Sequence, residues 1–328
     1  MLNFLNLKTE AFGLDINGSA LKIVKLKKKR GFFELVSYNN TAVKPGVIEN
    51  GEIKDEESLI KIIKDAQNTV KGEKLNTKYV VASLPEEKSF LQVIQMPKMK
   101  EEELRSAVSF EAENYIPLPI DQVYLDFEVI SPIVDHLNHF DVLIVAMPKI
   151  VVDSYASCFK KAGLIPSVLE VESQSMARAL VKDQTSNFPL IMLDIGENNI
   201  CFTAFAGRSI RFTSSIHISS KDLEKSKTPV LKELLSEVEK YLSFYQDHIF
   251  HEHLPQNIGT AKIILCGDGA DLKGLPDFLS KELKTTVELG NPLLNIPSKR
   301  IDDAFRKKSL IFATALGLAL RGINNNAD

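Results

Sequence analysis

The sequence predicts an α/β protein in which two halves share one plan and a smaller unit is inserted into the first half. One pattern occurs twice: an apolar strand, an aspartate, a tight turn and a second strand run through residues 12–24 and again through 190–202. Residues 86–149 interrupt this plan with elements of a different character. The chain of 328 residues, 44% of them hydrophobic, can bury enough core for about two domains.

The first half is expected to begin with three strands, followed by an amphipathic helix and a core strand. The predicted elements are strands at 14–16, 21–26, 32–38 and 79–85 and a helix at 55–70. The buried face of this helix is expected to be marked by its apolar residues, which are Leu59, Ile60, Ile62, Ile63 and Ala66. Pro85 ends the last strand because proline cannot donate a ladder hydrogen bond.

The inserted segment reads as a β-α-β-β unit. Its predicted elements are a strand at 89–95, a helix at 101–115 and strands at 123–130 and 140–147, the last two joined by a polar turn around 135–139. Pro117 and Pro119 follow the helix and break it.

After the insertion the first plan resumes and is then repeated. The predicted helices are 150–162, 173–181, 230–250, 276–283 and 309–320, and the predicted strands are 167–171, 190–195, 199–206, 209–215 and 261–265. The expected divisions are 1–85, 86–149, 150–187 and 188–328, with a short subdomain around 216–258 and a terminal helix, 309–320, that returns to the first half. Two similar halves imply a cleft, where an α/β protein commonly binds its ligand.

Asp15 and Asp194 end the first strands of the two repeated hairpins, and each is followed by a turn containing glycine. Backbone N–H groups of such a turn can bind phosphate, and the carboxylate can hold the Mg²⁺ that accompanies it. The pattern therefore predicts a nucleotide clamp with both aspartates near the metal, through water. The alternative is that both aspartates only cap their turns.

Three further features support a nucleotide site, each with a plain alternative. Gly267 and Gly269 lie between a core strand and a helix, so their backbone can approach a ligand. Lys22 can reach a phosphate or be a surface lysine. Glu237 and Lys240 share a helix face and can be a simple ion pair.

Composition argues against several other classes of protein. The formal net charge of −3 gives no electrostatic case for nucleic acid, and the basic run 25–31 is expected to be a solvated hairpin tip. Cys158, Cys201 and Cys266 have no metal-like or disulfide-like spacing and are expected to be buried thiols in a reducing compartment. No apolar run approaches the length of about 20 residues that a membrane span needs, so we expect a cytoplasmic protein.

With these elements in place, the chain resembles the actin-like superfamily, which shares a duplicated ribonuclease-H-like fold with Hsp70 and the sugar kinases. Within it the sequence is most similar to the PilM family of type IV pilus assembly proteins, relatives of the cell-division protein FtsA. Residues 13–24 and 193–205 resemble the two phosphate loops, and 265–275 the adenosine motif. The insertion resembles the SHS2-like 1C subdomain of FtsA, and its most specific stretches are 95–98, 102–104, 111–117 and 121–127.

The resemblance implies ATP and Mg²⁺ as ligands. The residues it assigns to the nucleotide are Asp15, Asn17, Gly18, Ser19, Lys22, Asp194, Gly196, Glu197, Asn198, Glu237, Lys240, Gly267, Asp268 and Gly269. The chain departs from the family pattern in three places. Asn17 stands where glycine is usual, although asparagine tolerates left-handed backbone angles. Glu197 and Asn198 replace small residues, and Asp268 replaces a glycine.

The resemblance also implies a protein partner. In PilM-like proteins a groove between the insertion and the first subdomain takes the N-terminal peptide of the inner-membrane protein PilN. The residues carried over to that groove are Leu84, Pro85, Leu104, Val108, Glu111, Ala112 and Tyr115, although the apolar face of their helix is equally typical of a core. Pilus motor ATPases and a homo-oligomer are further expected partners.

We therefore expect an adaptor at the inner face of the cytoplasmic membrane that binds ATP in its interdomain cleft and turns it over weakly or not at all. The only candidate general base is Glu197, and no residue is assigned a catalytic role. One alternative is an FtsA-like filament protein, which would end in an amphipathic helix, whereas residues 321–328 form a polar tail. The other is a sugar-kinase-type phosphotransferase, for which no substrate motif is visible.

Overall fold

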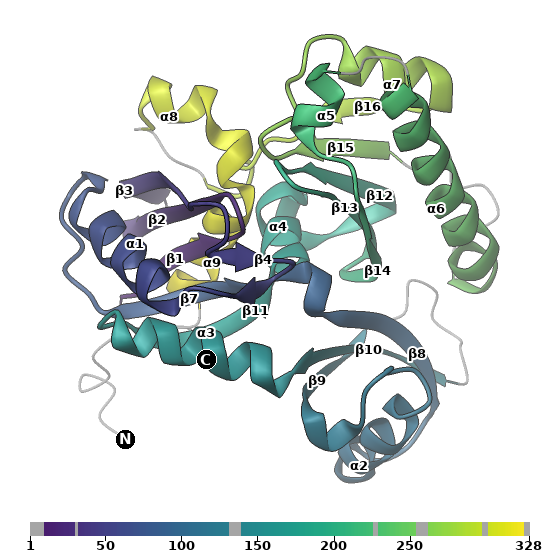
Figure 1. Cartoon of the computed structure of the whole chain (residues 1–328). Coiled ribbons are helices and arrows are strands. Elements are labelled where there is room, and N and C mark those ends of the chain that lie inside the picture. The colour runs from purple at the N-terminus through teal and green to yellow at the C-terminus, as the bar shows by residue number, and fades with distance from the viewer. Residues whose placement is uncertain are drawn as a thin grey trace. The chain divides into compact units, whose positions relative to one another are not determined.

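The computed structural model describes residues 10–29, 32–130, 139–225, 229–253, 262–296 and 301–324. The chain forms two compact units, each assembled from separate stretches of sequence (Figure 1). Unit 1 comprises 1–85, 153–180 and 291–328, and unit 2 comprises 86–152 and 181–290. The insertion thus belongs to the same compact unit as most of the second half, and the end of the chain belongs to unit 1.

Unit 1 is built on a six-stranded sheet with the order β11-β7-β1-β2-β3-β6. Its strands are β1 (Phe12–Ile16), β2 (Ala20–Lys29), β3 (Phe32–Ala42), β6 (Lys71–Gly72), β7 (Tyr79–Leu84) and β11 (Ile165–Val171). The three opening strands are antiparallel neighbours, whereas β7 and β11 join the sheet in parallel. The strands expected at 14–16, 21–26, 32–38, 79–85 and 167–171 are all present. A small hairpin, β4 (Ile48–Glu49) with β5 (Glu52–Ile53), lies outside this sheet.

The helices of unit 1 bury the faces that the sequence indicated. They are α1 (Glu56–Asn68), most of α3 (Lys149–Lys161), α4 (Glu172–Leu180), α8 (Asp303–Lys307) and α9 (Ala313–Asn324), which follows the 3₁₀ turn Ser309–Phe312. Asp55 caps α1 by accepting a hydrogen bond from the Ser58 N–H. Of the expected face of α1, Leu59, Ile63 and Ala66 are buried, whereas Ile60 and Ile62 are half-buried.

Helix α9 brings the C-terminal part of the chain against the N-terminal strands, as the yellow helix beside the purple strands in Figure 1 shows. It crosses α4 so closely that a Cβ on Gly317 would lie 1.7 Å from the Ser175 carbonyl oxygen. Glu170 at the end of β11 is buried and accepts hydrogen bonds from both Arg178 of α4 and Arg321 of α9. The two helices are therefore joined by packing and by one shared carboxylate.

Unit 2 contains an eight-stranded sheet with the order β16-β15-β12-β13-β14-β8-β10-β9. Its strands are β8 (Phe90–Pro97), β9 (Val123–Ile130), β10 (His139–Pro148), β12 (Ser186–Ile195), β13 (Ile200–Gly207), β14 (Ser209–Ile216), β15 (Lys262–Cys266) and β16 (Val287–Leu289). Its helices are α2 (Glu101–Ala112), α5 (Ser220–Lys225), α6 (Pro229–His253) and α7 (Leu275–Leu283), with 3₁₀ turns at Glu86–Lys88, Ile120–Gln122 and Lys182–Gln184. The repeated plan of the second half is therefore present.

The insertion has a core of its own but is also continuous with the second half. Helix α2 packs Val108 and Ala112 against Val142 and Ile144 of β10. Strand β8 pairs with β14 at a single position, Phe212 opposite Gln92, which makes one sheet of the two parts. The sequence indicated a separate β-α-β-β unit; pairing of the exposed edge of β14 satisfies backbone groups that would otherwise be open.

Two details differ from expectation, and most of one expected turn lies outside the described residues. Helix α2 ends at Ala112 and residues 113–115 form a turn, because Pro117 prevents the helix from continuing. Lys25 is not part of a solvated hairpin tip: it is buried, and its ammonium lies 2.9 Å from the carboxylate of Glu10. Of the polar turn expected around 135–139, residues 135–138 lie outside the described residues. His139 is the first residue of β10.

The expected burial of the thiols is confirmed, since Cys158, Cys201 and Cys266 are free and buried. Burial raises the pKa of Cys158 to about 12. Among the helices that the structure describes, none has the length and apolar character needed to cross a bilayer.

Candidate functional site

The first predicted phosphate loop is the turn between β1 and β2 in unit 1. Asp15 is buried at the end of β1, opposite Lys22 in the hairpin register. The Ser83 hydroxyl on neighbouring β7 donates to the Asp15 Oδ1 at 3.0 Å and accepts from the Ile16 N–H at 3.1 Å. Ser83 therefore fixes the Asp15 carboxylate at the strand end. Lys22 is buried too, which rules out the surface-lysine alternative.

The turn after Asp15 is closed by the side chain of Asn17. Its carboxamide Oδ1 accepts hydrogen bonds from the Ser19 N–H at 3.0 Å, the Ala20 N–H at 2.9 Å and the Ser19 hydroxyl at 2.9 Å. The Asn17 N–H donates to the Ala20 carbonyl at 3.0 Å. Asn17 does not have a positive φ. The tight turn is thus retained through side-chain bonding, not through the left-handed angle that the residue type suggested.

The second predicted phosphate loop lies between β12 and β13 in unit 2. Asp194 is half-buried near the end of β12, and the Gly196 N–H donates to the Asn199 carbonyl at 3.0 Å to form the turn. Asn198 is exposed at its tip. Glu197 pairs with Lys221 of α5 at 2.9 Å, and the hydrogen bond to Glu197 raises the pKa of Lys221. The negative charge that Glu197 adds to this loop is therefore matched by a nearby cation.

The glycine-rich segment after β15 lies directly against the second loop. Strands β12 and β15 are parallel neighbours, with Asp194 opposite Cys266. Gly267 has a φ of +89°, and a Cβ there would lie 2.2 Å from the Asp194 Oδ1. The Gly269 N–H donates to the Ile195 carbonyl at 2.8 Å. Unit 2 thus gathers Asp194, Gly196, Glu197, Asn198, Gly267, Asp268 and Gly269 in one place.

Glu237 and Lys240 contact each other on α6, with 3.5 Å between the Lys240 Nζ and the Glu237 Oε2. Lys240 also lies over the ring of Tyr241. This is the geometry of the surface ion pair that the sequence offered as the alternative. An adenine contact for these two residues stays a prediction.

The two loops differ in how well they fit a metal-bound nucleotide. In unit 2, the Asp194 carboxylate lies against the Gly267 backbone beside the turn that begins at Gly196, which suits a phosphate with its Mg²⁺. In unit 1, Asp15 is fixed in place but the N–H groups of Ser19 and Ala20 already have an acceptor. No group of three or more acidic, histidine or cysteine side chains forms a metal cage within the described ranges. Mg²⁺ does not need one, because it is usually held by one or two carboxylates and the phosphates.

The residues assigned to the peptide groove are mostly buried. Leu84 and Pro85 end β7 in unit 1, and the apolar face of α2 in unit 2 forms the core of the insertion. The buried residues are Leu84, Pro85, Leu104, Val108 and Ala112. Glu111 is half-buried, whereas Tyr115 is 38% exposed. For Leu104, Val108 and Ala112 the core alternative therefore holds, because their side chains are already packed inside the insertion.

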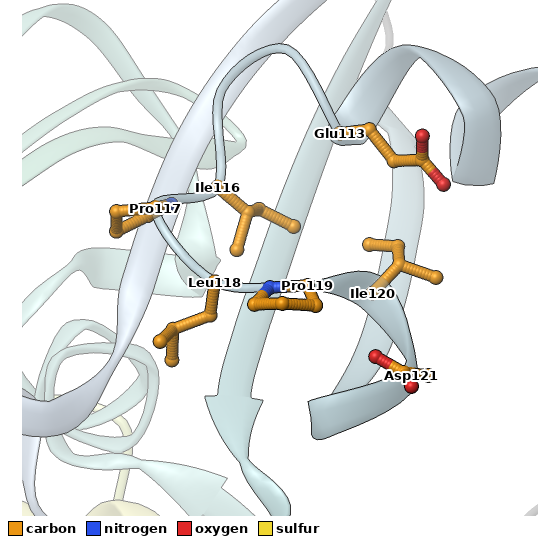
Figure 2. Close-up of a pocket in the computed structure, with 7 residues that line it drawn as sticks. All are labelled: Glu113, Ile116, Pro117, Leu118, Pro119, Ile120 and Asp121. Carbon is orange, nitrogen blue, oxygen red and sulfur yellow. The ribbon is translucent and has the colours of Figure 1, made fainter.

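An open hollow of about 570 Å³ lies immediately after α2 (Figure 2). Its lining is apolar in the middle and acidic at one side, and comprises Glu113, Ile116, Pro117, Leu118, Pro119, Ile120 and Asp121. Leu118 is 39% exposed, so an apolar side chain is offered to a ligand. The two prolines restrict the backbone of this segment, which keeps the hollow preformed.

Sequence reasoning missed three groups of residues that shape these sites. In the sequence, Ser83 is one polar residue inside an apolar strand. Nothing there indicates that it is buried beside Asp15. Lys221 lies 24 positions from Glu197 in a short helix that no pattern linked to the loop. The segment 116–119 was interpreted only as a helix breaker, and its exposed Leu118 was not recognised as part of a surface hollow.

Comparisons with known proteins show the family and the fold of the chain. The model of the family described as "Type IV pilus assembly protein PilM" matches residues 13–215 and 221–323. A solved structure titled "PilM-PilN type IV pilus biogenesis complex" contains a chain that is 28% identical, with a TM-score of 0.81, over 96% of this chain and 99% of that one.

More distant solved structures share the fold alone. The ethanolamine utilization protein EutJ from Carboxydothermus hydrogenoformans has a TM-score of 0.51 and 14% identity, over 94% of this chain and 89% of that one. MreB5 of Spiroplasma citri bound to ADP has a TM-score of 0.52 and 8% identity, over 97% of each chain. The fold is therefore actin-like, as the repeated hairpins predicted. With the family model matching nearly the whole chain, this protein belongs to the PilM family of type IV pilus assembly proteins.

Proposed function

We propose that this chain is an adaptor of the type IV pilus assembly platform that binds ATP and the N-terminal tail of a PilN-like inner-membrane protein. The observation that carries the proposal is the full-length likeness to a chain of the PilM-PilN complex. Attachment to the inner face of the cytoplasmic membrane then comes through the partner. Contacts with pilus motor ATPases and self-association remain predictions of the family resemblance.

The second loop supports nucleotide binding. Asp194 would hold Mg²⁺ through water, while the backbone of Gly196, Gly267 and Gly269 would approach the phosphates and adenosine. In unit 1, Asp15 would take the matching role on the first loop. Glu197 is ion-paired to Lys221, so it does not stand as a general base for water. ATP would accordingly act as a ligand that shifts a conformational population rather than as a rapidly hydrolysed substrate.

The hollow beside α2 supports peptide binding. Leu118 exposes apolar surface in its lining, and Glu113 and Asp121 place two carboxylates there (Figure 2). A short peptide with an apolar anchor and a neighbouring basic residue would complement both properties. This segment replaces the buried face of α2 as the part of the insertion that we propose contacts the partner.

Isothermal titration calorimetry of the full chain tests both ligands. Mg-ATP is titrated alone, then a PilN-type N-terminal peptide alone, then each in the presence of the other. Binding of both supports the adaptor, and a change in either affinity shows coupling. Peptide binding without ATP would indicate an actin-like scaffold that has lost its nucleotide. ATP-dependent phosphorylation of a sugar or acetate, measured as ADP release, would contradict the adaptor in favour of a kinase.

The substitution Leu118→Asp tests the peptide surface. We expect peptide affinity to fall at least about ten-fold, because a charge replaces an apolar contact in the hollow. Leu289→Asp is the matched control. Leu289 is 44% exposed on β16, which forms the edge of the eight-stranded sheet opposite β9. Equal affinities in the two variants would contradict the assignment of the hollow, whereas Mg-ATP binding should be unchanged in both.

A further inference from the structure

In the first predicted phosphate loop, the side chain of Asn17 already accepts hydrogen bonds from backbone N–H groups. We infer that Asn17 competes with nucleotide phosphate for the N–H groups of Ser19 and Ala20 and thereby limits the affinity of the chain for ATP. The inference rests on the proposed binding of ATP, and it assigns Asn17 a role that the loop pattern alone did not suggest.

The geometry of the turn carries the argument. Both backbone N–H groups point at the Asn17 Oδ1, at 3.0 Å and 2.9 Å, and the Ser19 hydroxyl adds a third hydrogen bond at 2.9 Å. A carboxamide oxygen that accepts from successive N–H groups of a tight turn occupies the position at which a phosphate oxygen would accept them. Each N–H carries one hydrogen, so a phosphate can use these groups only after the Asn17 side chain leaves.

Besides the Asn17 side chain, backbone hydrogen bonds also hold the turn. The backbone bond from the Asn17 N–H to the Ala20 carbonyl closes it, and the β1–β2 register continues directly from Ile16 opposite Leu21. Ser83 fixes the preceding Asp15 carboxylate independently. Replacing Asn17 should therefore release the N–H groups while leaving the hairpin in place.

Replacing Asn17 by glycine isolates this effect. A glycine has no side chain to compete, so its turn would present free N–H groups to a ligand. In the parent, phosphate must replace two neutral hydrogen bonds, those from the N–H groups of Ser19 and Ala20 to Asn17. In Asn17→Gly these bonds are absent, so we expect Mg-ATP affinity to rise about ten-fold. Asn17→Asp should act in the opposite sense, since a carboxylate would hold the same donors more strongly and repel phosphate.

The experiment measures Mg-ATP affinity of the full chain by calorimetry for the parent, Asn17→Gly, Asn17→Ala and Asn17→Asp. The alanine variant serves as a second test if the added flexibility of glycine weakens the hairpin. Asn50→Gly is the matched control: Asn50 also precedes a glycine in a hairpin turn of unit 1, with a φ of +47° that glycine adopts freely. Adenosine is titrated in parallel as a probe without phosphate.

A second readout does not depend on nucleotide. Amide hydrogen exchange at Ser19 and Ala20 in the ligand-free chain should be slow in the parent and at least about ten-fold faster in Asn17→Gly and Asn17→Ala. Unchanged exchange would overturn the inference, because it would show that the side chain does not protect these groups.

The calorimetric outcomes separate this inference from the proposed function. Tighter Mg-ATP binding by Asn17→Gly and Asn17→Ala, with weaker binding by Asn17→Asp and unchanged binding of adenosine, supports the competition. If Asn17→Gly and Asn17→Ala bind Mg-ATP but the parent does not, the competition is supported as well. ATP binding by the natural chain is then refuted. Equal affinities in parent and variants overturn the inference and leave the proposed function standing. No binding by any variant overturns both.

Discussion

At the scale of single residues, the second loop leaves no room for a Cβ atom at Gly267. Its φ of +89° is already unfavourable for a side chain, and an added Cβ would lie 2.2 Å from the Asp194 Oδ1 and 2.8 Å from the Ile195 carbonyl oxygen. A methyl group here must displace the aspartate that we propose holds Mg²⁺. The residue therefore links the local backbone angle to the geometry of the site.

Gly267→Ala is expected to reduce Mg-ATP affinity at least about ten-fold and to destabilise unit 2 by more than the backbone term of about 1–2 kcal/mol. The control is Gly274→Ala, because Gly274 has a similar φ of +83° but a Cβ added there would meet no atom within 4 Å. That variant should show the backbone cost alone, with ATP affinity retained. Thermal unfolding and calorimetry measure the two effects, and equal results for both variants would contradict the proposed contact with Asp194.

At the scale of elements, unit 1 depends on the crossing of α4 and α9. These helices meet at Gly317, where the Ser175 carbonyl leaves no room for a Cβ, and both carry an arginine that binds the buried Glu170. The shared carboxylate was not predictable, because Glu170, Arg178 and Arg321 are separated by up to 151 positions.

Gly317→Ala is expected to destabilise the chain by about 1–3 kcal/mol, since the helices must move apart and the gain in helix propensity is smaller. Gly322→Ala on the same helix provides the comparison. A Cβ there would lie 3.3 Å from its nearest neighbours, so its cost should be small or offset by propensity. Urea unfolding followed by circular dichroism gives both free energies. A Gly317→Ala variant as stable as Gly322→Ala would contradict the tight crossing.

Across the whole molecule, the sequence predicted the elements well because their signals are local. Apolar periodicity, prolines and the repeated aspartate turns located the longer strands and helices, and the resemblance to the actin-like superfamily indicated the fold. The short elements β4, β5, β6, β16, α5 and α8 were not predicted. Contacts between residues far apart in the sequence could not be predicted. Nothing in the run 25–31 indicated that Lys25 would be buried against Glu10, and nothing near Asn17 indicated that its side chain would fill the first loop. The face of α2 was equally compatible with a core and a groove, and only packing within the insertion resolved it.

The largest such long-range feature is the joint between the insertion and the second half in unit 2. Arg211 on β14 and Asp141 on β10 are almost fully buried, with 3.0 Å between the Arg211 Nη1 and the Asp141 Oδ2. The same arginine donates to the Ala206 carbonyl. Within the described strands, a single residue pair, Phe212 with Gln92, joins β14 to β8 beside this ion pair. The ion pair therefore links the insertion to the second half at the joint of the eight-stranded sheet.

Arg211→Met should destabilise unit 2 by about 3–5 kcal/mol, because it leaves the Asp141 carboxylate buried without its guanidinium partner. The double variant Arg211→Met with Asp141→Leu removes both charges and should recover most of that loss, since a buried ion pair can often be replaced by apolar residues. Urea unfolding monitored by circular dichroism measures both free energies. A single variant within about 1 kcal/mol of the parent would show that the ion pair is dispensable, because its removal would then cost far less than breaking a buried ion pair requires.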